Sequence, residues 1–271
     1  MIDFKESYEK KLSEDFKKKG YLIFNTNDTA SLNYLRDKIV SSIEKACNLN
    51  HKKNKSKEDF LNTFHKKIKK HNLNNYRLKI INLINKDRKF KENYFHSAKK
   101  LLYTIVGNEL SMQTRVNLSI QTPKDNSSLL PVHSDIWSGD SPFEVVVWIP
   151  LVNCFKTKAM YILPPNEYKK VEKNFSKYSG KSSKEFFNKI KKKVKWIHID
   201  FGQILIFNQA LPHGNVVNEE NETRWSMNCR FKSIFSPYGD KKIGEFFEPI
   251  TLKVASELAL KYKLPQIDEK S

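Results

Sequence analysis

The stretch Arg115-Val116-Asn117-Leu118-Ser119-Ile120-Gln121 alternates between polar and apolar residues. Successive side chains of a strand point to opposite faces of a sheet, so this alternation predicts a strand with one buried face. Further strands are predicted downstream, where short apolar or alternating runs are separated by turn residues: 143–151, 159–163, 196–200, 203–208, 213–218 and 224–234. Such a succession of short strands favours an antiparallel double-sheet core, either a barrel or a jelly roll.

The residues before this β core are predicted to be mainly helical, with one short apolar strand at 21–24. Asp28 is placed to cap a helix. Apolar residues follow it with the period of an amphipathic helix: Leu32, Leu35, Ile39, Ile43 and Ala46. The chain is therefore expected to be of the α+β or mainly β class, with helices packed on one face of the β core.

We expect a single domain over residues 1–271. Its mainly helical part would cover 1–110, its β core 111–236, and a C-terminal helix 237–271. A Lys-rich segment, 166–193, is expected to interrupt the β core as a helical insertion, and we hypothesise that it covers the mouth of the barrel.

The composition excludes several classes of protein. Hydrophobic residues make up 39% of the chain and aromatic residues 12%, which is enough for a packed core. No apolar run approaches the roughly 18 residues of a membrane span, and no basic start followed by an apolar stretch indicates a signal peptide. The three cysteines, Cys47, Cys154 and Cys229, are too widely spaced for a disulfide framework or a Cys-based zinc site, which favours a reducing cytoplasm.

The net charge of +19 permits two interpretations. A basic chain can bind nucleic acid or another polyanion, or its lysines can form a solvated surface. The Lys runs lie mostly in helical, solvent-facing patterns, and the sequence holds no helix-turn-helix, zinc-finger or aromatic RNA-binding motif. We therefore expect no nucleic-acid site, although an anionic small-molecule substrate is compatible with this charge.

His133-Ser134-Asp135 and the distant His213 form a candidate metal site. Residues i and i+2 of a strand point to the same face, so His133 and Asp135 can bind one ion, and His213 would come from a neighbouring strand. Two imidazoles and one carboxylate on one face of Fe(II) leave the opposite positions open for a co-substrate and O₂. The same His-x-Asp pattern also occurs by chance, in which case His133 is a histidine of a loop or of the core.

The surroundings of this motif resemble the Fe(II)/2-oxoglutarate-dependent oxygenases, in particular their phytanoyl-CoA hydroxylase-like branch. The resemblance rests on Trp148-Ile149-Pro150-Leu151 after the His-x-Asp segment, on the Gly-turn-strand 200–207, and on Leu211-Pro212-His213-Gly214. It implies a double-stranded β-helix, that is, a jelly-roll or cupin-like barrel, flanked by N-terminal helices. It also implies that His133, Asp135 and His213 are the catalytic iron ligands and that 2-oxoglutarate is the co-substrate.

In this family an Arg at about the distance of Arg224 from His213, often followed by x-Ser, binds the distal carboxylate of 2-oxoglutarate. Arg224 and Ser226 match that pattern, and Arg230 is the second candidate for the anchor. Asn117 and Gln121 lie on the strand that lines the co-substrate pocket in related enzymes. An alternative interpretation is that Arg224 or Arg230 pairs with a nearby acid such as Glu219 or Glu222.

Three residues are candidate substrate contacts: Trp137, which follows the metal motif directly, and Asn228 and Arg230, which share a strand face with Arg224. The resemblance implies an oxidoreductase, a dioxygenase that releases succinate and CO₂ as it hydroxylates its substrate. The branch favours a small polar or sugar-containing metabolite.

Two other functions are compatible with parts of the sequence. A cupin-like metal enzyme could use the same barrel without 2-oxoglutarate, but its usual His-x-His pattern is absent and Arg224 would then have no role. A non-enzymatic polyanion-binding protein could use the Lys surface, but it would have no need for a complete ligand set.

Overall fold

The computed structural model describes residues 4–52, 54–178 and 180–263. Its N-terminal part contains the α-helices α1 (Ser7–Lys19), α2 (Thr29–Cys47), α3 (Lys57–Asn62), α4 (Leu73–Asn85) and α5 (Arg88–Ile105), the 3₁₀ turns η1 (Phe64–Lys66) and η2 (Lys70–Asn72), and the strand β1 (Tyr21–Asn25). Local sequence sets two of these boundaries. Helix α1 ends at Gly20, whose φ of 78° is left-handed, and the Asp28 side chain accepts a hydrogen bond from the Ser31 backbone at the start of α2.

The larger of two sheets is antiparallel throughout, in the order β1-β7-β4-β9-β2-β10, and β3 also pairs with β9. The strands of this sheet that follow β1 are β2 (Leu110–Gln113), β3 (Asn117–Gln121), β4 (Val145–Pro150), β7 (Gln203–Asn208), β9 (Arg224–Ser233) and β10 (Phe247–Thr251). Strand β9 is the longest of them and pairs with β2, β3 and β4, so it lies at the centre of the sheet.

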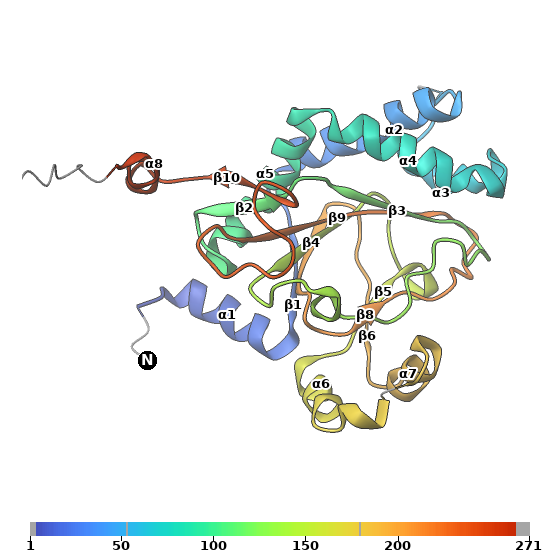
Figure 1. Cartoon of the computed structure of the whole chain (residues 1–271). Helices are drawn as coiled ribbons and strands as arrows, with labels where there is room; N and C mark the ends of the chain where they lie inside the picture. Colours follow the sequence, from blue (N-terminus) through green and yellow to red (C-terminus); the bar gives the residue numbers. More distant parts are fainter. Residues whose placement is uncertain (1–3, 53, 179, 264–271) are drawn as a thin grey trace, which may run out of the picture.

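The smaller sheet has the order β6-β5-β8, with β5 (Met160–Ile162), β6 (Lys195–Ile197) and β8 (His213–Gly214). An isolated antiparallel bridge between His133 and His213 attaches the segment before the turn η3 (Asp135–Ser138) to the edge strand β8. The two sheets face each other as a double-stranded β-helix, or jelly roll, which confirms the expected fold class (Figure 1).

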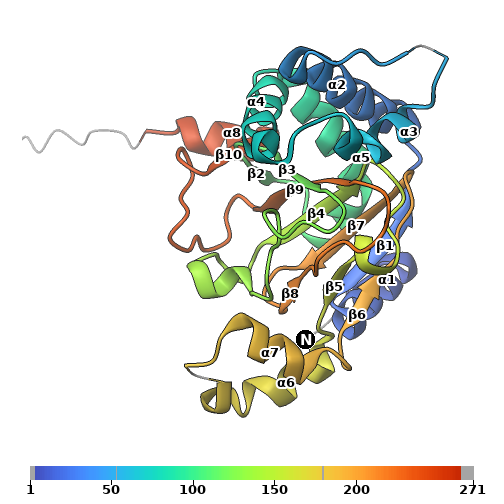
Figure 2. The same ribbon diagram turned by 90° about the vertical axis from the view of Figure 1, so that its right-hand side faces the viewer.

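The outer face of the larger sheet is covered by helices α2, α3, α4 and α5 (Figures 1 and 2). Alternation along the strands divides their side chains between this layer and the interior of the sandwich. In β4, Val145, Val147 and Ile149 belong to the core cluster shared with the helices, whereas Val146 and Trp148 belong to a second cluster between the sheets. The expected helical covering of one face is therefore present.

The expected insertion at 166–193 consists of α6 (Pro165–Glu172), the turn η5 (Phe175–Tyr178) and α7 (Ser183–Ile190). A third cluster anchors it, in which Val171, Phe186 and Ile190 pack against Tyr161 and Leu163 of the smaller sheet's β5 segment. The insertion lies on the opposite side of the sandwich from α2–α5 (Figure 2).

Two expectations about strands were wrong. The segment 237–271 was expected to form only a C-terminal helix, but it first forms β10, an edge strand on β2 with an irregular register between Pro249 and Thr251. Proline cannot donate a ladder hydrogen bond, so it weakens the strand signal in the sequence while being tolerated at a sheet edge. The strand expected at 213–218 is limited to His213–Gly214, because the Asn215 and Val216 backbones leave the sheet to bond with Leu130 and Gln121.

The end of the described chain is α8 (Val254–Lys261), which has no buried residue. The turn η4 (Lys156–Lys158) precedes β5. None of the described helices is long and apolar enough to cross a membrane. Cys47, Cys154 and Cys229 are free thiols, as their spacing predicted.

Trp225 offers a test of the contact between β9 and the helical layer. Its side chain is fully buried, its indole N–H donates to the Leu61 carbonyl at 2.9 Å, and its ring packs edge-on against Phe64. We expect Trp225→Ala to lower the free energy of unfolding by about 3–5 kcal/mol, measured by denaturant titration. Trp137→Ala is the matched control, because Trp137 is 42% exposed, and an equal loss in both variants would contradict the packing described here.

Candidate metal centre

A cavity of about 230 Å³ lies between the two sheets. The larger sheet lines it with residues of β3, β4, β7 and β9, and the smaller sheet with Met160 of β5 and His213 and Gly214 of β8. The β9 residues that face this cavity are polar, since Arg224, Asn228 and Arg230 alternate with the apolar residues that face the helices. The interior of the sandwich is thus a polar site enclosed by apolar layers.

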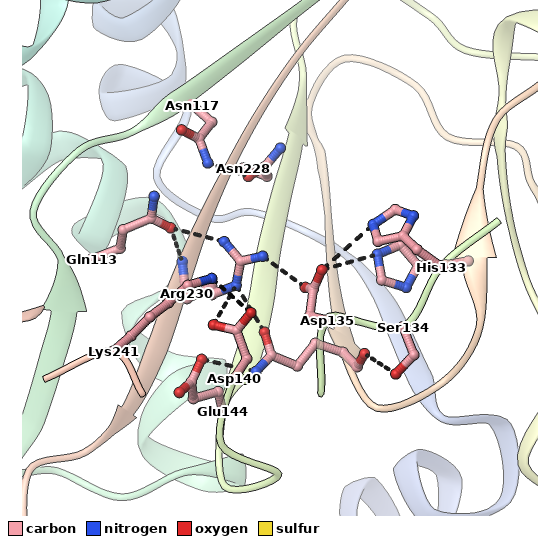
Figure 3. Close-up of polar contacts among 12 residues, drawn as sticks. Gln113, Asn117, His133, Ser134, Asp135, Asp140, Glu144, Asn228, Arg230 and Lys241 are labelled. Carbon is pink, nitrogen blue, oxygen red and sulfur yellow. Dashed lines mark hydrogen bonds and ion pairs between the residues drawn. The ribbon is translucent and has the colours of Figure 1, made fainter. Parts of the chain in front are cut away.

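His133, Asp135 and His213 converge on this cavity, with one ligand atom of each lying within 4.8 Å of the others. Nε2 of His133 is 3.4 Å and Nε2 of His213 is 4.0 Å from Oδ1 of Asp135 (Figure 3). Reciprocal backbone hydrogen bonds of 3.0 and 2.8 Å between His133 and His213 fix the two imidazoles side by side. Asp135 begins the turn η3 rather than continuing a strand, yet its side chain still meets both imidazoles.

Both imidazoles have their metal-binding nitrogen free. Nδ1 of His133 is 2.8 Å from the Pro131 carbonyl, and Nδ1 of His213 is 2.8 Å from the Leu211 carbonyl. A carbonyl oxygen can only accept, so Nδ1 carries the proton in each ring and the lone pair lies on Nε2. This is the arrangement in which protein histidines bind a metal, because the second nitrogen orients the ring.

The electrostatics of the cavity favour the protonation states that a cation needs. Burial lowers the pKa of His213 to about 4, so its ring is neutral near neutral pH. Burial alone would raise the pKa of Asp135, but its contacts with His133, His213 and Arg230 outweigh burial and hold the pKa below its usual value. A carboxylate and a neutral imidazole are therefore present together.

Arg230 supports the ligand carboxylate. Its Nη2 lies 2.9 Å from Oδ2 of Asp135, and its Nε donates to the Gln209 side chain at 2.9 Å. The Gln113 side-chain oxygen accepts from the Arg230 backbone and from Nη1, and Asp140 lies 3.7 Å from Nε (Figure 3). With these partners the guanidinium is held against Asp135, so the structure places Arg230 as a positioning residue for the metal ligand.

Arg224 differs from Arg230 in lacking such partners. Its side chain is 2% exposed, and Nη2 donates to the Ser119 hydroxyl at 2.9 Å. Nε and Nη1 of Arg224, and the hydroxyl of Ser226, are buried without a hydrogen-bond partner among the described residues. Burial lowers the pKa of the guanidinium. A buried cation without a counter-charge is costly, so an anion bound beside this group would stabilise it.

The other predicted site residues divide into two groups. Asn117 and Asn228 both line the cavity and share a hydrogen bond of 3.0 Å. Gln121 lies at the end of β3, where its amide donates to the Val216 carbonyl, and it does not line the cavity. Trp137 lies outside the cavity, beside the helical insertion.

The sequence analysis did not single out Gln113, Gln209 or Asp140, which hold Arg230. No motif marks them, because they come from β2, from the end of β7 and from the loop after η3. Ser119 was detectable, since it alternates with Asn117 on the polar face of β3.

The comparisons with known proteins concern structure alone, because no protein-family profile and no curated protein sequence matches the chain. A non-haem monooxygenase, the ThoJ–nickel complex, is similar with a TM-score of 0.56 at 14% identity, over 89% of this chain and 84% of that one. The non-haem α-ketoglutarate-dependent carbocyclase SnoK from nogalamycin biosynthesis has a TM-score of 0.55 at 12% identity, over 89% and 96% of the chains.

This chain has the fold of the non-haem 2-oxoglutarate-dependent oxygenases. The epimerase SnoN in complex with Fe³⁺, α-ketoglutarate and nogalamycin RO is a further neighbour, with a TM-score of 0.52 at 11% identity over 86% of both chains. At these identities the likeness establishes the fold, and the resemblance to the phytanoyl-CoA hydroxylase-like branch stays a prediction.

The metal site can be tested with single substitutions. We expect His133→Ala, Asp135→Ala and His213→Ala each to abolish tight Fe(II) or Ni(II) binding in anaerobic calorimetric titration, because each removes one of the converging ligands. His198→Ala is the matched control, since His198 follows β6, is exposed, and is not one of the converging ligands. Undiminished binding in the Asp135 variant would place the metal elsewhere.

The unmatched charge of Arg224 predicts an unusual effect on stability. We expect Arg224→Met to raise the free energy of unfolding of the ligand-free protein by about 1–3 kcal/mol, because it removes a buried group with unsatisfied donors. Arg88→Met, at a side chain that is 91% exposed, should change it by less than about 0.5 kcal/mol. A destabilised Arg224 variant would show that the protein itself compensates this charge.

Proposed function

We propose that the chain is a non-haem Fe(II)- and 2-oxoglutarate-dependent dioxygenase that works as a single domain. His133, Asp135 and His213 would bind the iron, and Arg224 would bind the distal carboxylate of 2-oxoglutarate. The single observation that carries the proposal is the buried Arg224, which lines the cavity that the three ligands share and whose Nε and Nη1 have no hydrogen-bond partner among the described residues. A dicarboxylate that also chelates the metal supplies the missing anion.

The residues present fit both groups. Two imidazoles and a carboxylate form the facial donor set of non-haem iron sites, which leaves positions open for a chelating keto acid and O₂. When bound, iron and 2-oxoglutarate together supply the oxidising power, with release of succinate and CO₂. The remaining task of the protein is to bind the iron, the keto acid and the substrate, to orient them, and to exclude water.

Each cavity residue has a part in that task. The planar guanidinium of Arg224 offers parallel donors that match a carboxylate. The Ser226 hydroxyl, which has no hydrogen-bond partner among the described residues, lies two residues further along β9 on the same strand face. Arg230 keeps Asp135 charged and oriented, which leaves the carboxylate free to bind the metal. Asn117 and Asn228 present amide groups to the space around the metal, where polar atoms of the substrate or co-substrate would lie.

Hydroxylation of a small metabolite is the outcome that we propose, and a polar or sugar-containing reacting portion would suit the amide-lined cavity. The neighbours include a monooxygenase, an epimerase and a carbocyclase, so the fold admits more than one oxidative outcome. A cupin-like metal enzyme that does not use 2-oxoglutarate would leave Arg224 uncompensated.

The role of Arg224 can be measured on protein loaded with Ni(II), which takes the place of iron without turnover. We expect Arg224→Ala to weaken 2-oxoglutarate binding about a hundredfold in calorimetry, since a buried charge-assisted pair is lost, while Ni(II) affinity is retained. Arg224→Lys should recover only part of the loss, because lysine lacks the paired donors.

Arg88→Ala serves as the control for a change of net charge, because Arg88 lies on the exposed face of α5. Equal binding of 2-oxoglutarate to the Arg224→Ala protein would show that another residue binds its distal carboxylate. It would also favour the cupin-like metal enzyme as the alternative function.

A further inference from the structure

A second cavity, of about 300 Å³, lies between the turn η3 and the helical insertion. It belongs to a different part of the molecule from the sandwich interior, because its walls come from the segment 132–138 and from η5 and α7. Six of the residues that line it carry the argument: His133, Trp137, Phe175, Tyr178, Lys181 and Phe186.

The second cavity begins at the metal centre. His133 lines both cavities, and its side chain is 28% exposed, whereas the side chains of Asp135 and His213 are each 7% exposed. His133 is therefore the most exposed of the three ligands and borders both cavities. The inner cavity of about 230 Å³ is smaller than the roughly 300–1,000 Å³ of sites for drug-sized ligands. A bound metal and keto acid would occupy much of it, and the second cavity, which also borders His133, offers room for a larger substrate.

Aromatic rings form the wall of this second cavity. The rings of Trp137 and Phe175 lie 5.5 Å apart at an angle of 56°, and Phe186 lies 6.0 Å from Trp137. Tyr178 packs edge-on against Phe186 at 5.1 Å. Trp137 is 42% and Phe175 43% exposed, although such side chains usually bury most of their surface. The exposed faces of these two rings are thus available to a planar ligand.

Trp137 is fixed in place on both sides. It belongs to η3, which begins at the ligand Asp135, and its ring packs against Phe175 and Phe186 of the insertion. Trp137 therefore connects the metal centre with the helical insertion. A ligand on Trp137 would be held at a fixed distance from the iron ligands, as positioning for reaction requires.

One ammonium group borders the second cavity. Lys181 lines it, and no acidic residue is among its described lining residues. Glu185, on the following helix, feels the charge of Lys181 but does not itself line the cavity. The combination of exposed aromatic faces with an ammonium group suits a planar ring that carries a carboxylate or another anionic oxygen.

We propose that this second cavity binds an aromatic acid portion of the substrate, with its ring against Trp137 and Phe175 and its anionic group toward Lys181. The proposal rests on the proposed function, because it extends the substrate of that same metal centre. The aromatic acid portion lies in the second cavity beside His133, and the reacting carbon lies at the metal. The insertion 166–193 then forms part of the substrate site and is more than a cover.

The experiment uses 2-naphthoate as the probe and the full chain, measured by calorimetry and saturation-transfer NMR, with and without Ni(II) and 2-oxoglutarate. We expect 2-naphthoate to bind, and Trp137→Ala and Phe175→Ala each to weaken it about tenfold, the equivalent of about 1.4 kcal/mol. Trp137→Phe should lose less than about threefold, and it keeps the test valid if the alanine variant folds poorly. Phe235→Ala, at a phenylalanine that is 60% exposed and lies outside the cavity, should leave binding unchanged.

The uncharged isostere 2-naphthamide tests the role of Lys181. The wild-type protein should prefer 2-naphthoate, and Lys181→Gln should remove that preference while leaving the amide's affinity unchanged. Absence of 2-naphthoate binding, an unaltered dissociation constant in the Trp137→Ala protein, or equal or tighter binding of methyl β-D-glucopyranoside would each overturn the proposal.

The two proposals fail separately. Because the aromatic cavity does not depend on a bound metal, ring binding without a metal–keto acid complex would contradict the proposed function alone. A metal–keto acid complex without ring binding would contradict the aromatic site alone.

Discussion

The two faces of strand β9 impose the constraint on which the rest of the molecule depends. One face carries the apolar side chains that pack against the helices: Trp225, Met227, Cys229 and Phe231. The other carries the polar side chains that face the interior of the sandwich: Arg224, Ser226, Asn228 and Arg230. A shift of one residue in the register of β9 would exchange these faces. The packing of the helical layer therefore also fixes the position of the two arginines beside the metal ligands.

The two arginines illustrate how an interior charge acquires a function. Arg230 is matched by the carboxylate of Asp135 and by the side chains of Gln113 and Gln209, so its charge is compensated within the protein. Arg224 has the Ser119 hydroxyl and two donor atoms without partners. An uncompensated buried charge costs free energy. Arg230 therefore supports a ligand carboxylate, whereas in the proposed function the charge of Arg224 would be compensated by the carboxylate that it binds.

The sequence carried enough information to predict the fold class, the converging ligands and the interior position of Arg224. Strand alternation reflects local geometry, which repeats from protein to protein, whereas the convergence of His213 with His133 and Asp135 was predicted through the family resemblance. The fate of Gln121 was not predictable, because it depends on the Val216 carbonyl, which a distant loop brings to the end of β3. The pairing of Arg230 with Asp135 likewise depends on how η3 turns after His133.

The edge strand β10 and the second cavity could not be predicted from the sequence either. Pro249 weakened the strand pattern of β10, whose existence depends on a free edge of β2. The aromatic wall combines Trp137 with Phe175 and Phe186, which lie in the insertion and carry no motif. Both features arise from tertiary contacts between segments that carry no recognisable motif of their own.

The central claim is that one cavity holds the iron and its keto acid together. The most direct measurement is an anaerobic titration of Fe(II) and 2-oxoglutarate, following the weak visible charge-transfer absorption of an iron–keto acid chelate. The account predicts that this absorption appears only when both are present and that it is lost in the Asp135→Ala protein. Metal binding without this absorption at saturating 2-oxoglutarate would contradict it.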